Sequence, residues 1–189
     1  AGHAGSVPMP LRKDALLGAA EITVALHEIA TQVPGNPTVG TVGTMNVFPA
    51  SRNIIAEEVT FTIDLRDIDL ERRNRYEKQL MERIEAITKK HGLTYSISED
   101  TNSAPRYCAD WMKAIIQEQC TALGLEAPEL MSGPFHDALT LSYACDYAMI
   151  FIRSKDGISH NPLEYSSYED LALGTQVMYG TVLQILETK

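Results

Sequence analysis

Two of the five histidines in this chain lie in loops whose composition suits a binding site. His160 stands in "GISHNP", among turn-forming residues that are not typical of helix or strand interiors, and His136 stands in "SGPFHDA". Imidazole is the commonest side-chain ligand for metal ions, and a ligand must be held in one orientation by its surroundings. One or two histidines do not complete a site of three or four ligands, so spacing alone also permits ordinary surface histidines.

Three polar residues in the first half of the chain form a second candidate group. His3 lies among small residues in "AGHAGSVPMP", Asn53 lies just before a strand in "FPASRNII", and Arg66 lies on the polar face of a strand in "TIDLRD". Each of them alone suits a surface loop, a turn or a strand edge. Together they supply an imidazole, an amide and a guanidinium, which can bind a carboxylate and a carbonyl oxygen. The chain contains no P-loop, dinucleotide-binding fingerprint or G-x-S-x-G nucleophile motif.

The elements that must position the first-half residues follow from hydrophobic periodicity. Apolar residues at three- and four-residue spacings predict two helices, over residues 11–30 and 70–92. Alternating or β-branched runs predict three strands, over residues 38–46, 57–67 and 93–100. The order helix, strand, strand, helix, strand predicts a ferredoxin-like βαββαβ module that lacks its first strand.

The second half of the chain has a different pattern. It is predicted to contain, in order, a helix over 109–123, a short strand near Leu130, a helix over 137–145, an apolar strand over 147–152 and a helix from about Tyr168. A continuously apolar strand between helices is typical of an α/β layer covered on both faces. Ligands bind beyond the carboxyl ends of such strands, where His136 and His160 fall. We place the domain boundary near Ala104, which divides the chain into residues 1–104 and 105–189.

The charge balance argues against several classes of partner. Sixteen basic residues stand against 25 acidic ones, giving a net charge of -9, and no basic stripe is interleaved with aromatic residues. We therefore expect no nucleic-acid partner and no membrane partner, and instead a small molecule or another protein. No apolar run reaches the ~20 residues that cross a bilayer, and the first residues lack the pattern of a secretory signal, so we expect a cytoplasmic protein.

Five motifs taken together resemble one known family. The motifs are "AGHAGSVPMPLRKDA", "NVFPASRNII", "FTIDLRD", "SGPFHDA" and "DGISHNPLEYSSYED". They are similar, in order and spacing, to motifs of the M20-type metal-dependent amidohydrolases, in the branch of N-carbamoyl-L-amino-acid hydrolases and allantoate amidohydrolases. The similarity runs through essentially the whole chain, and the combination of five motifs is far more specific than any single one.

The resemblance implies a two-domain subunit. Its α/β catalytic domain holds two divalent metal ions, zinc or alternatively manganese or cobalt, and is interrupted by a lid domain through which two subunits pair as a homodimer. Residues 1–104 would be the ferredoxin-like lid and dimerisation domain, and residues 105–189 the C-terminal portion of a metallopeptidase-like α/β catalytic domain. The family's upstream catalytic part is not in this sequence, so we expect a fragment that is inactive alone.

The resemblance also implies a role for each candidate residue. His160 matches a metal ligand, and His3 matches a catalytic lid histidine that reaches the neighbouring subunit's site and polarises the scissile carbonyl group. Asn53 and Arg66 match lid residues that bind the substrate, the arginine by its carboxylate. The implied reaction is metal-dependent hydrolysis of the amide C–N bond of N-carbamoyl-L-amino acids or related ureido acids, with a small-molecule substrate.

A second substrate-binding loop departs from the family pattern. Gly133 and His136 match a loop of small residues that lines the pocket and binds the substrate, but Pro134 and Phe135 stand where small residues are usual, so we expect a substrate pocket of different shape. Allantoate amidohydrolase and an aminoacylase-like M20 peptidase therefore stay open as alternatives. From another class, a non-enzymatic dimerising ligand sensor also fits a ferredoxin-like domain.

Overall fold

The computed structural model describes residues 1–187, which fall into two compact units. Unit 1 comprises Ala1–Pro105 and unit 2 comprises Arg106–Lys189. None of the helices over residues 1–187 combines the length and the apolar character that a bilayer-spanning segment requires.

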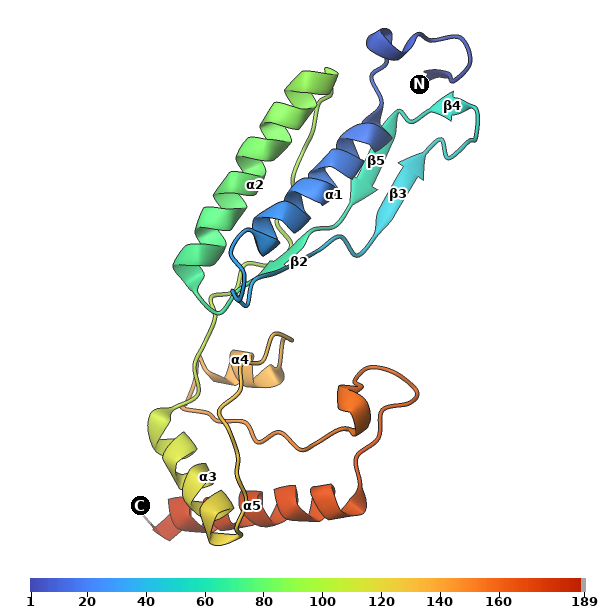
Figure 1. Ribbon diagram of the computed structural model, residues 1–189. Coiled ribbons are helices and arrows are strands. Elements are labelled where there is room, and N and C mark those ends of the chain that lie inside the picture. Colours follow the sequence, from blue (N-terminus) through green and yellow to red (C-terminus); the bar gives the residue numbers. More distant parts are fainter. Residues whose placement is uncertain (188–189) are drawn as a thin grey trace. The chain divides into compact units, whose positions relative to one another are not determined.

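Unit 1 is built on two long helices that lie side by side (Figure 1). α1 spans Ala15–Thr31 and begins at Asp14, whose carboxylate accepts hydrogen bonds from two backbone N–H groups of the first turn. α2 spans Leu70–His91 and ends at Gly92, which adopts the left-handed conformation with φ at 61°. The two predicted helices are thus confirmed, and their apolar stripes meet in one core formed by Ile22, Ala25, Leu26, Ile29, Tyr76, Leu80, Ile84 and Ile87.

The strands of unit 1 pack against these helices. β2 (Val39–Thr41) pairs antiparallel with β6 (Asp64–Arg66), and β3 (Met45–Phe48) pairs antiparallel with β5 (Glu58–Phe61). A third, shorter pair joins β1 (Gly2–His3) to β4 (Ile54–Ile55). The predicted alternation of apolar and polar residues is confirmed in the segment from β5 to β6, where one face packs on the core through Phe61, Ile63 and Leu65.

A β-bulge joins the two longer ladders. Thr41 pairs with Asp64, but four residues further along Met45 pairs with Phe61 instead of Thr60. One strand therefore has one more residue than the other between the two ladders. Such a bulge bends the strand pair and increases its twist, which explains why two predicted strands appear as four shorter ones.

The strand predicted over residues 93–100 is wrong. None of these residues belongs to a strand, although the segment after α2 runs back along unit 1 (Figure 1). Its far end is tied to α2, because Arg73 donates hydrogen bonds of 2.7 Å to the carbonyl oxygen of Ser103 and to the side-chain oxygen of Asn102. A strand requires a ladder partner, and alternation in the sequence does not report whether one is present.

Unit 2 contains three α-helices and a short 3-10 helix within its described residues. The elements are α3 (Asp110–Ala122), α4 (Asp137–Leu141), η2 (Lys155–Gly157) and α5 (Tyr168–Glu187). α3 packs against α5, and the described residues that are buried here are Cys120, Val177 and Thr181. Ser167 caps the start of α5, because the N–H of Asp170 donates to Oγ of Ser167 over 3.0 Å.

The two strands predicted in unit 2 are also wrong. Neither the segment near Leu130 nor residues 147–152 form a strand, and the helix predicted over 137–145 ends at Leu141. A single backbone hydrogen bond of 2.9 Å joins the carbonyl oxygen of Tyr147 to Ala109. Continuously apolar strands belong in sheets with neighbours on both sides, and the described residues of unit 2 supply no such neighbours.

Candidate active site

His3 is the last residue of β1 and is held against the segment that carries Asn53. β1 pairs with β4, and the N–H of Ala4 donates to the carbonyl oxygen of Asn53 over 2.8 Å. The N–H of Gly5 donates to Nδ1 of the His3 ring over 3.0 Å. A neutral imidazole whose Nδ1 accepts a hydrogen bond carries its proton on Nε2. The exposed ring of His3 therefore offers an Nε2–H donor to a ligand.

Asn53 lies beside His3. The register places His3 opposite Ile54, the residue that follows Asn53. Oγ of Ser51 donates to Oδ1 of Asn53 over 2.9 Å, so the amide oxygen has a partner inside the protein and the NH2 end is the donor for a ligand. The structure thus brings two of the predicted site residues together, and both offer N–H donors.

Arg66 forms a bidentate ion pair with Asp64 on the outer face of β6. Nε of Arg66 donates to Oδ1 of Asp64 over 2.8 Å, and Nη2 donates to Oδ2 over 2.6 Å. These hydrogen bonds lower the pKa of Asp64 and raise the pKa of Arg66. The side chain of Asp64 is 50% exposed and that of Arg66 is 44% exposed, so solvent and ligands reach the pair. The guanidinium thus already makes the two-point contact by which arginine recognises a carboxylate.

Arg66 lies at the opposite end of the strand pairs of unit 1 from His3 and Asn53. β4, next to Asn53, and β2, which pairs with Arg66, mark these two ends in Figure 1. Glu58 begins β5 and Arg66 ends β6 eight residues later, a path of about 25 Å at ~3.3 Å per residue. One unit therefore does not bring Arg66 together with the other two residues on a single small molecule.

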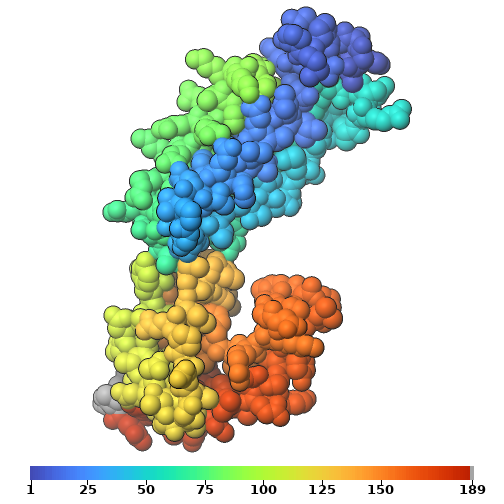
Figure 2. Space-filling view, in the orientation of Figure 1, coloured from blue at the N-terminus to red at the C-terminus, as the bar shows by residue number. Residues whose placement is uncertain are grey.

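His160 occupies an exposed loop with an unusual backbone conformation. Its φ is 54°, in the left-handed region that few residues other than glycine adopt. Hydrogen bonds hold it there, because its N–H donates to the Glu164 carboxylate over 2.8 Å and its Nδ1 lies 2.8 Å from Oγ of Ser159. The loop around residues 150–165 stands out from the rest of unit 2 in the space-filling view (Figure 2). Non-glycine residues with a left-handed backbone conformation, such as His160, are concentrated at functional sites.

His136 and Gly133 lie in the loop before α4. Nε2 of His136 is 2.5 Å from Oγ of Ser132, and its ring meets the edge of Phe151 with the centroids 5.8 Å apart. A Cβ on Gly133 would meet no atom within 4 Å. Packing within the described residues therefore does not require glycine at this position. Phe135 is 57% exposed, so its bulk projects from the same loop.

The described residues fit a metal ion only in part. Residues 1–187 contain no group of three or more His, Cys, Asp and Glu side chains placed to hold one. His160 fits the role of a single ligand, since Ser159 contacts Nδ1 and Nε2 is the other ring nitrogen.

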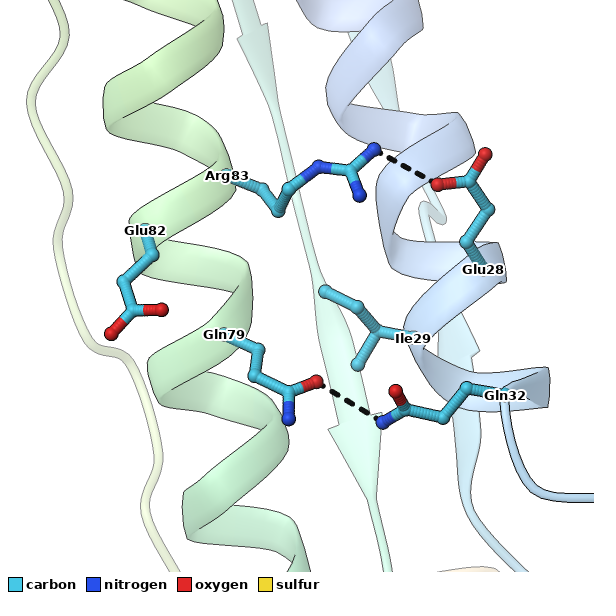
Figure 3. A pocket seen from close by; sticks show the side chains of 6 residues that line it. All are labelled: Glu28, Ile29, Gln32, Gln79, Glu82 and Arg83. Atoms are coloured by element: carbon cyan, nitrogen blue, oxygen red, sulfur yellow. Dashed lines mark hydrogen bonds and ion pairs between the residues drawn. The ribbon is translucent and has the colours of Figure 1, made fainter.

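A shallow pocket between α1 and α2 is separate from all six predicted site residues. Its lining consists of Glu28, Ile29, Gln32, Gln79, Glu82 and Arg83 (Figure 3). Two interactions cross it, from Arg83 to Glu28 over 2.9 Å and from Gln32 to Gln79 over 3.1 Å. These contacts fasten one helix to the other, so we read the pocket as part of the helix packing.

Some contacts around the site were not predicted from the sequence. Of these, only the pairing of Asp64 with Arg66 has a sequence signal, because residues two apart on a strand share a face. The contacts that Gly5 and Ser51 make with His3 and Asn53 depend on loop conformation, which hydrophobic periodicity does not encode.

Known proteins match this chain along most of its length. Residues 11–184 match the family described as Peptidase family M20/M25/M40. An N-carbamoyl-L-amino-acid amidohydrolase from Pseudomonas sp. (strain NS671) is 41% identical over 184 residues, covering 97% of this chain and 44% of that protein. A ureidoglycolate hydrolase from Arabidopsis thaliana is 37% identical over 187 residues, covering 97% of this chain and 39% of that protein.

A solved structure agrees with these matches. A crystal structure of an amidase of the hydantoinase/carbamoylase family from Burkholderia vietnamiensis superimposes with a TM-score of 0.90 at 31% identity, covering 97% of this chain and 44% of that one. The mixed α/β fold of the chain is therefore that of the M20 peptidase-like proteins. The chain spans less than half the length of the relatives it matches.

Proposed function

The chain belongs to peptidase family M20/M25/M40, and from this we propose that it supplies substrate-binding residues and one metal ligand to an amidohydrolase. The reaction is hydrolysis of the amide C–N bond of N-carbamoyl-L-amino acids or related ureido acids. The observation that carries this proposal is the pairing of β1 with β4, which places His3 opposite Ile54 and so sets the N–H donors of His3 and Asn53 side by side at one end of unit 1.

His3 and Asn53 bind the carbonyl oxygen of the scissile group. The Nε2–H of His3 and the amide NH2 of Asn53 donate to this oxygen, on which negative charge develops as water adds to the carbon. Donors fixed in advance stabilise such a transition state, and loss of one costs about 10²–10³ in kcat. The hydrogen bonds from Gly5 and Ser51 fix these donors within the protein.

Arg66 binds the carboxylate of the substrate. Its bidentate pair with Asp64 supports this role, because a substrate carboxylate presents the same two oxygens to the guanidinium. Asp64 therefore stands in for the substrate and must give way, at least in part, when the substrate binds. Removal of such a charge-assisted pair costs about 1.5–3 kcal/mol, or about 10–150-fold in kcat/KM.

The substrate lies between two subunits of a homodimer. Residues 1–104 act as the ferredoxin-like lid and dimerisation domain in this proposal, and His3 and Asn53 of one subunit bind the same substrate molecule as Arg66 of the other. The separation of about 25 Å along the β5–β6 path supports this arrangement, since a carbamoyl amino acid is much shorter.

Residues 105–189 are the C-terminal part of the catalytic domain in this proposal. Gly133 and His136 line the substrate pocket, and Nε2 of His160 is one ligand of a site for two divalent ions, zinc, manganese or cobalt. Members of the family are generally dependent on divalent metals. Such ions, when bound, lower the pKa of a water molecule so that hydroxide forms near neutral pH. Few of the described residues of unit 2 are buried, and this supports the proposal that a further part of the catalytic domain covers it.

A second candidate substrate is a ureido acid that is shorter than an N-carbamoyl amino acid. The similarity to ureidoglycolate hydrolase favours it, as does Phe135, whose exposed ring takes up space in the loop that we assign to the pocket. Allantoate is a third ureido acid to be compared in the same assay.

A substrate panel on the complete hydrolase tests the proposal. Ammonia release is measured with carbamoyl amino acids of increasing side-chain size, ureidoglycolate and allantoate, and release of the free amino acid is measured with an acetylated amino acid, each with added zinc, manganese or cobalt. We expect turnover of a carbamoyl or ureido acid and its steep loss in Arg66→Ala, but not in Arg75→Ala, an exposed arginine of α2. Equal kcat/KM for Arg66→Ala and wild type would remove Arg66 from the site.

The isolated chain provides a second test. We expect no hydrolysis by residues 1–189 alone and only weak zinc binding, because His160 is a single ligand among the described residues. Submicromolar zinc binding by this chain in isothermal titration would contradict the proposal.

A further inference from the structure

We propose that Arg12 is a positioning residue that fixes both the orientation and the tautomer of His3; this inference rests on the role proposed for His3 above. Arg12 follows the short 3-10 helix η1 (Met9–Leu11) and is partly buried. Its Nε donates to the carbonyl oxygen of Val7 over 3.0 Å, and its Nη2 donates to the carbonyl oxygen of Ala4. One guanidinium thus joins the two ends of the segment 4–7 that follows His3.

The shape of this segment decides where the N–H of Gly5 points. The N–H groups of Ser6 and Val7 both donate to the carbonyl oxygen of His3, over 3.1 and 3.3 Å, so the segment folds back on His3. Gly5 lies so close to the ring that a Cβ there would be 3.2 Å from Cε1 of His3. A small movement of the segment therefore withdraws the only hydrogen bond that the structure gives to Nδ1 within residues 1–187.

Arg12 is itself fixed to the body of unit 1. It lies two residues before Asp14, which caps α1, and the N–H of Ala15 donates to the carbonyl oxygen of Ala56 over 3.2 Å. Ala56 follows β4, the partner of β1. The helix start and the strand pair thus form a frame, and Arg12 connects the His3 loop to it.

Loss of Arg12 therefore acts on His3 without any contact between the two side chains. Once the Gly5 N–H moves away from Nδ1, the neutral imidazole is free to carry its proton on either nitrogen. Molecules with the proton on Nδ1 present an acceptor where the substrate oxygen needs a donor. We expect kcat to fall by up to about 10²-fold, the effect of a misplacement of about 1 Å, with KM little changed.

Nitrogen-15 NMR of the imidazole rings in the 189-residue chain tests the inference directly. In its neutral form the wild-type ring of His3, identified through His3→Gln, should show a protonated Nε2 and an unprotonated Nδ1. Arg12→Ala should give a mixture of tautomers, while circular dichroism and the Tyr76 signals show that unit 1 stays folded. Arg12→Lys should resemble Arg12→Ala, because an ammonium does not reproduce the planar fork between two carbonyl groups. Arg75→Ala is the charge-matched control and should leave the ring unchanged.

The outcomes separate this inference from the proposed function. A wild-type ring with its proton on Nδ1, or a tautomer unchanged in folded Arg12→Ala, would overturn the positioning role whatever the activity. If Arg12→Ala fails to fold, the tautomer of His3 in wild type and in Arg12→Lys still tests the positioning role. In the complete hydrolase, millimolar guanidinium should restore part of kcat to Arg12→Ala but not to Arg75→Ala. A mixed tautomer with undiminished kcat would support the positioning role and overturn the catalytic role of His3.

Discussion

Replacement of Arg72 by alanine tests the ion pair that holds the end of strand β6. The Asp67 side chain is 0% exposed and the Arg72 side chain is 17% exposed. The carboxylate of Asp67 accepts a hydrogen bond of 2.7 Å from Nε of Arg72 and one of 2.8 Å from the backbone N–H of Asp69. The hydroxyl of Thr38, just before β2, donates to the same carboxylate. Burial raises the pKa of Asp67, but these hydrogen bonds outweigh it and hold the pKa below its ordinary value.

The expected loss of stability follows from this burial. Without Arg72 the buried carboxylate has no cation in contact, and breaking a buried pair in this way costs about 3–5 kcal/mol. Because Arg72 is partly exposed, we take the lower end, about 3 kcal/mol, which lowers the Tm of a domain of about 100 residues by roughly 12–24 °C. Asp67→Asn combined with Arg72→Met should recover most of this loss, since no uncompensated charge is then buried.

Thermal unfolding followed by circular dichroism measures this effect. The fluorescence of the single tryptophan, Trp111, reports unit 2 separately and should be unaffected. Because the pKa of Asp67 is depressed in the folded state, its stabilising contribution is present above the ordinary value near 3.8 and is lost as the pH falls through the folded value. The difference between wild type and Arg72→Ala should therefore shrink in acid. A Tm within about 3 °C of wild type at neutral pH, against an unchanged Arg75→Ala control, would refute the reasoning.

Three further substitutions have defined outcomes. Gly92→Ala should lower the stability of unit 1 by about 1 kcal/mol in urea titration, because the residue holds φ at 61°. Gly174→Ala should destabilise unit 2, since a Cβ there would overlap Cγ2 of Ile152, and adding Ile152→Ala should restore part of the loss, as Trp111 fluorescence would show. Asp64→Asn in the complete hydrolase should lower KM by up to about fivefold, because the competing exposed pair is worth about 1 kcal/mol at most; a raised KM would instead mean that Asp64 orients Arg66.

Helices were the elements that the sequence predicted best. α1 and α2 carry regular apolar stripes that bury against each other, and local signals at Asp14 and Gly92 mark where they start and stop. Strands depend on partners far away in the chain. The residues 93–100 and 147–152 have the composition of strands but no ladder partner among residues 1–187, and periodicity alone gives no means of knowing this.

The candidate site was predicted by residue type but not by arrangement. The family resemblance predicts that His3, Asn53 and Arg66 act on the substrate, and it is the register of β1 with β4 that places the first two together. The path along β5 and β6 then separates Arg66 from them. His160 was expected to be rigidly held, and its hydrogen bonds with Glu164 and Ser159 supply a physical reason for such rigidity.

Subunit complementation tests most directly the proposal that the two ends of unit 1 serve different substrate molecules. His3→Ala and Arg66→Ala forms of the complete hydrolase, each inactive alone, are unfolded together, refolded and assayed. In a symmetric dimer with a shared site, half of the dimers are hybrids and each hybrid has one intact site, so the mixture should regain about a quarter of wild-type activity. If His3 and Arg66 of the same subunit bound the same substrate, every site would lack one of them, and the mixture would stay as inactive as its components.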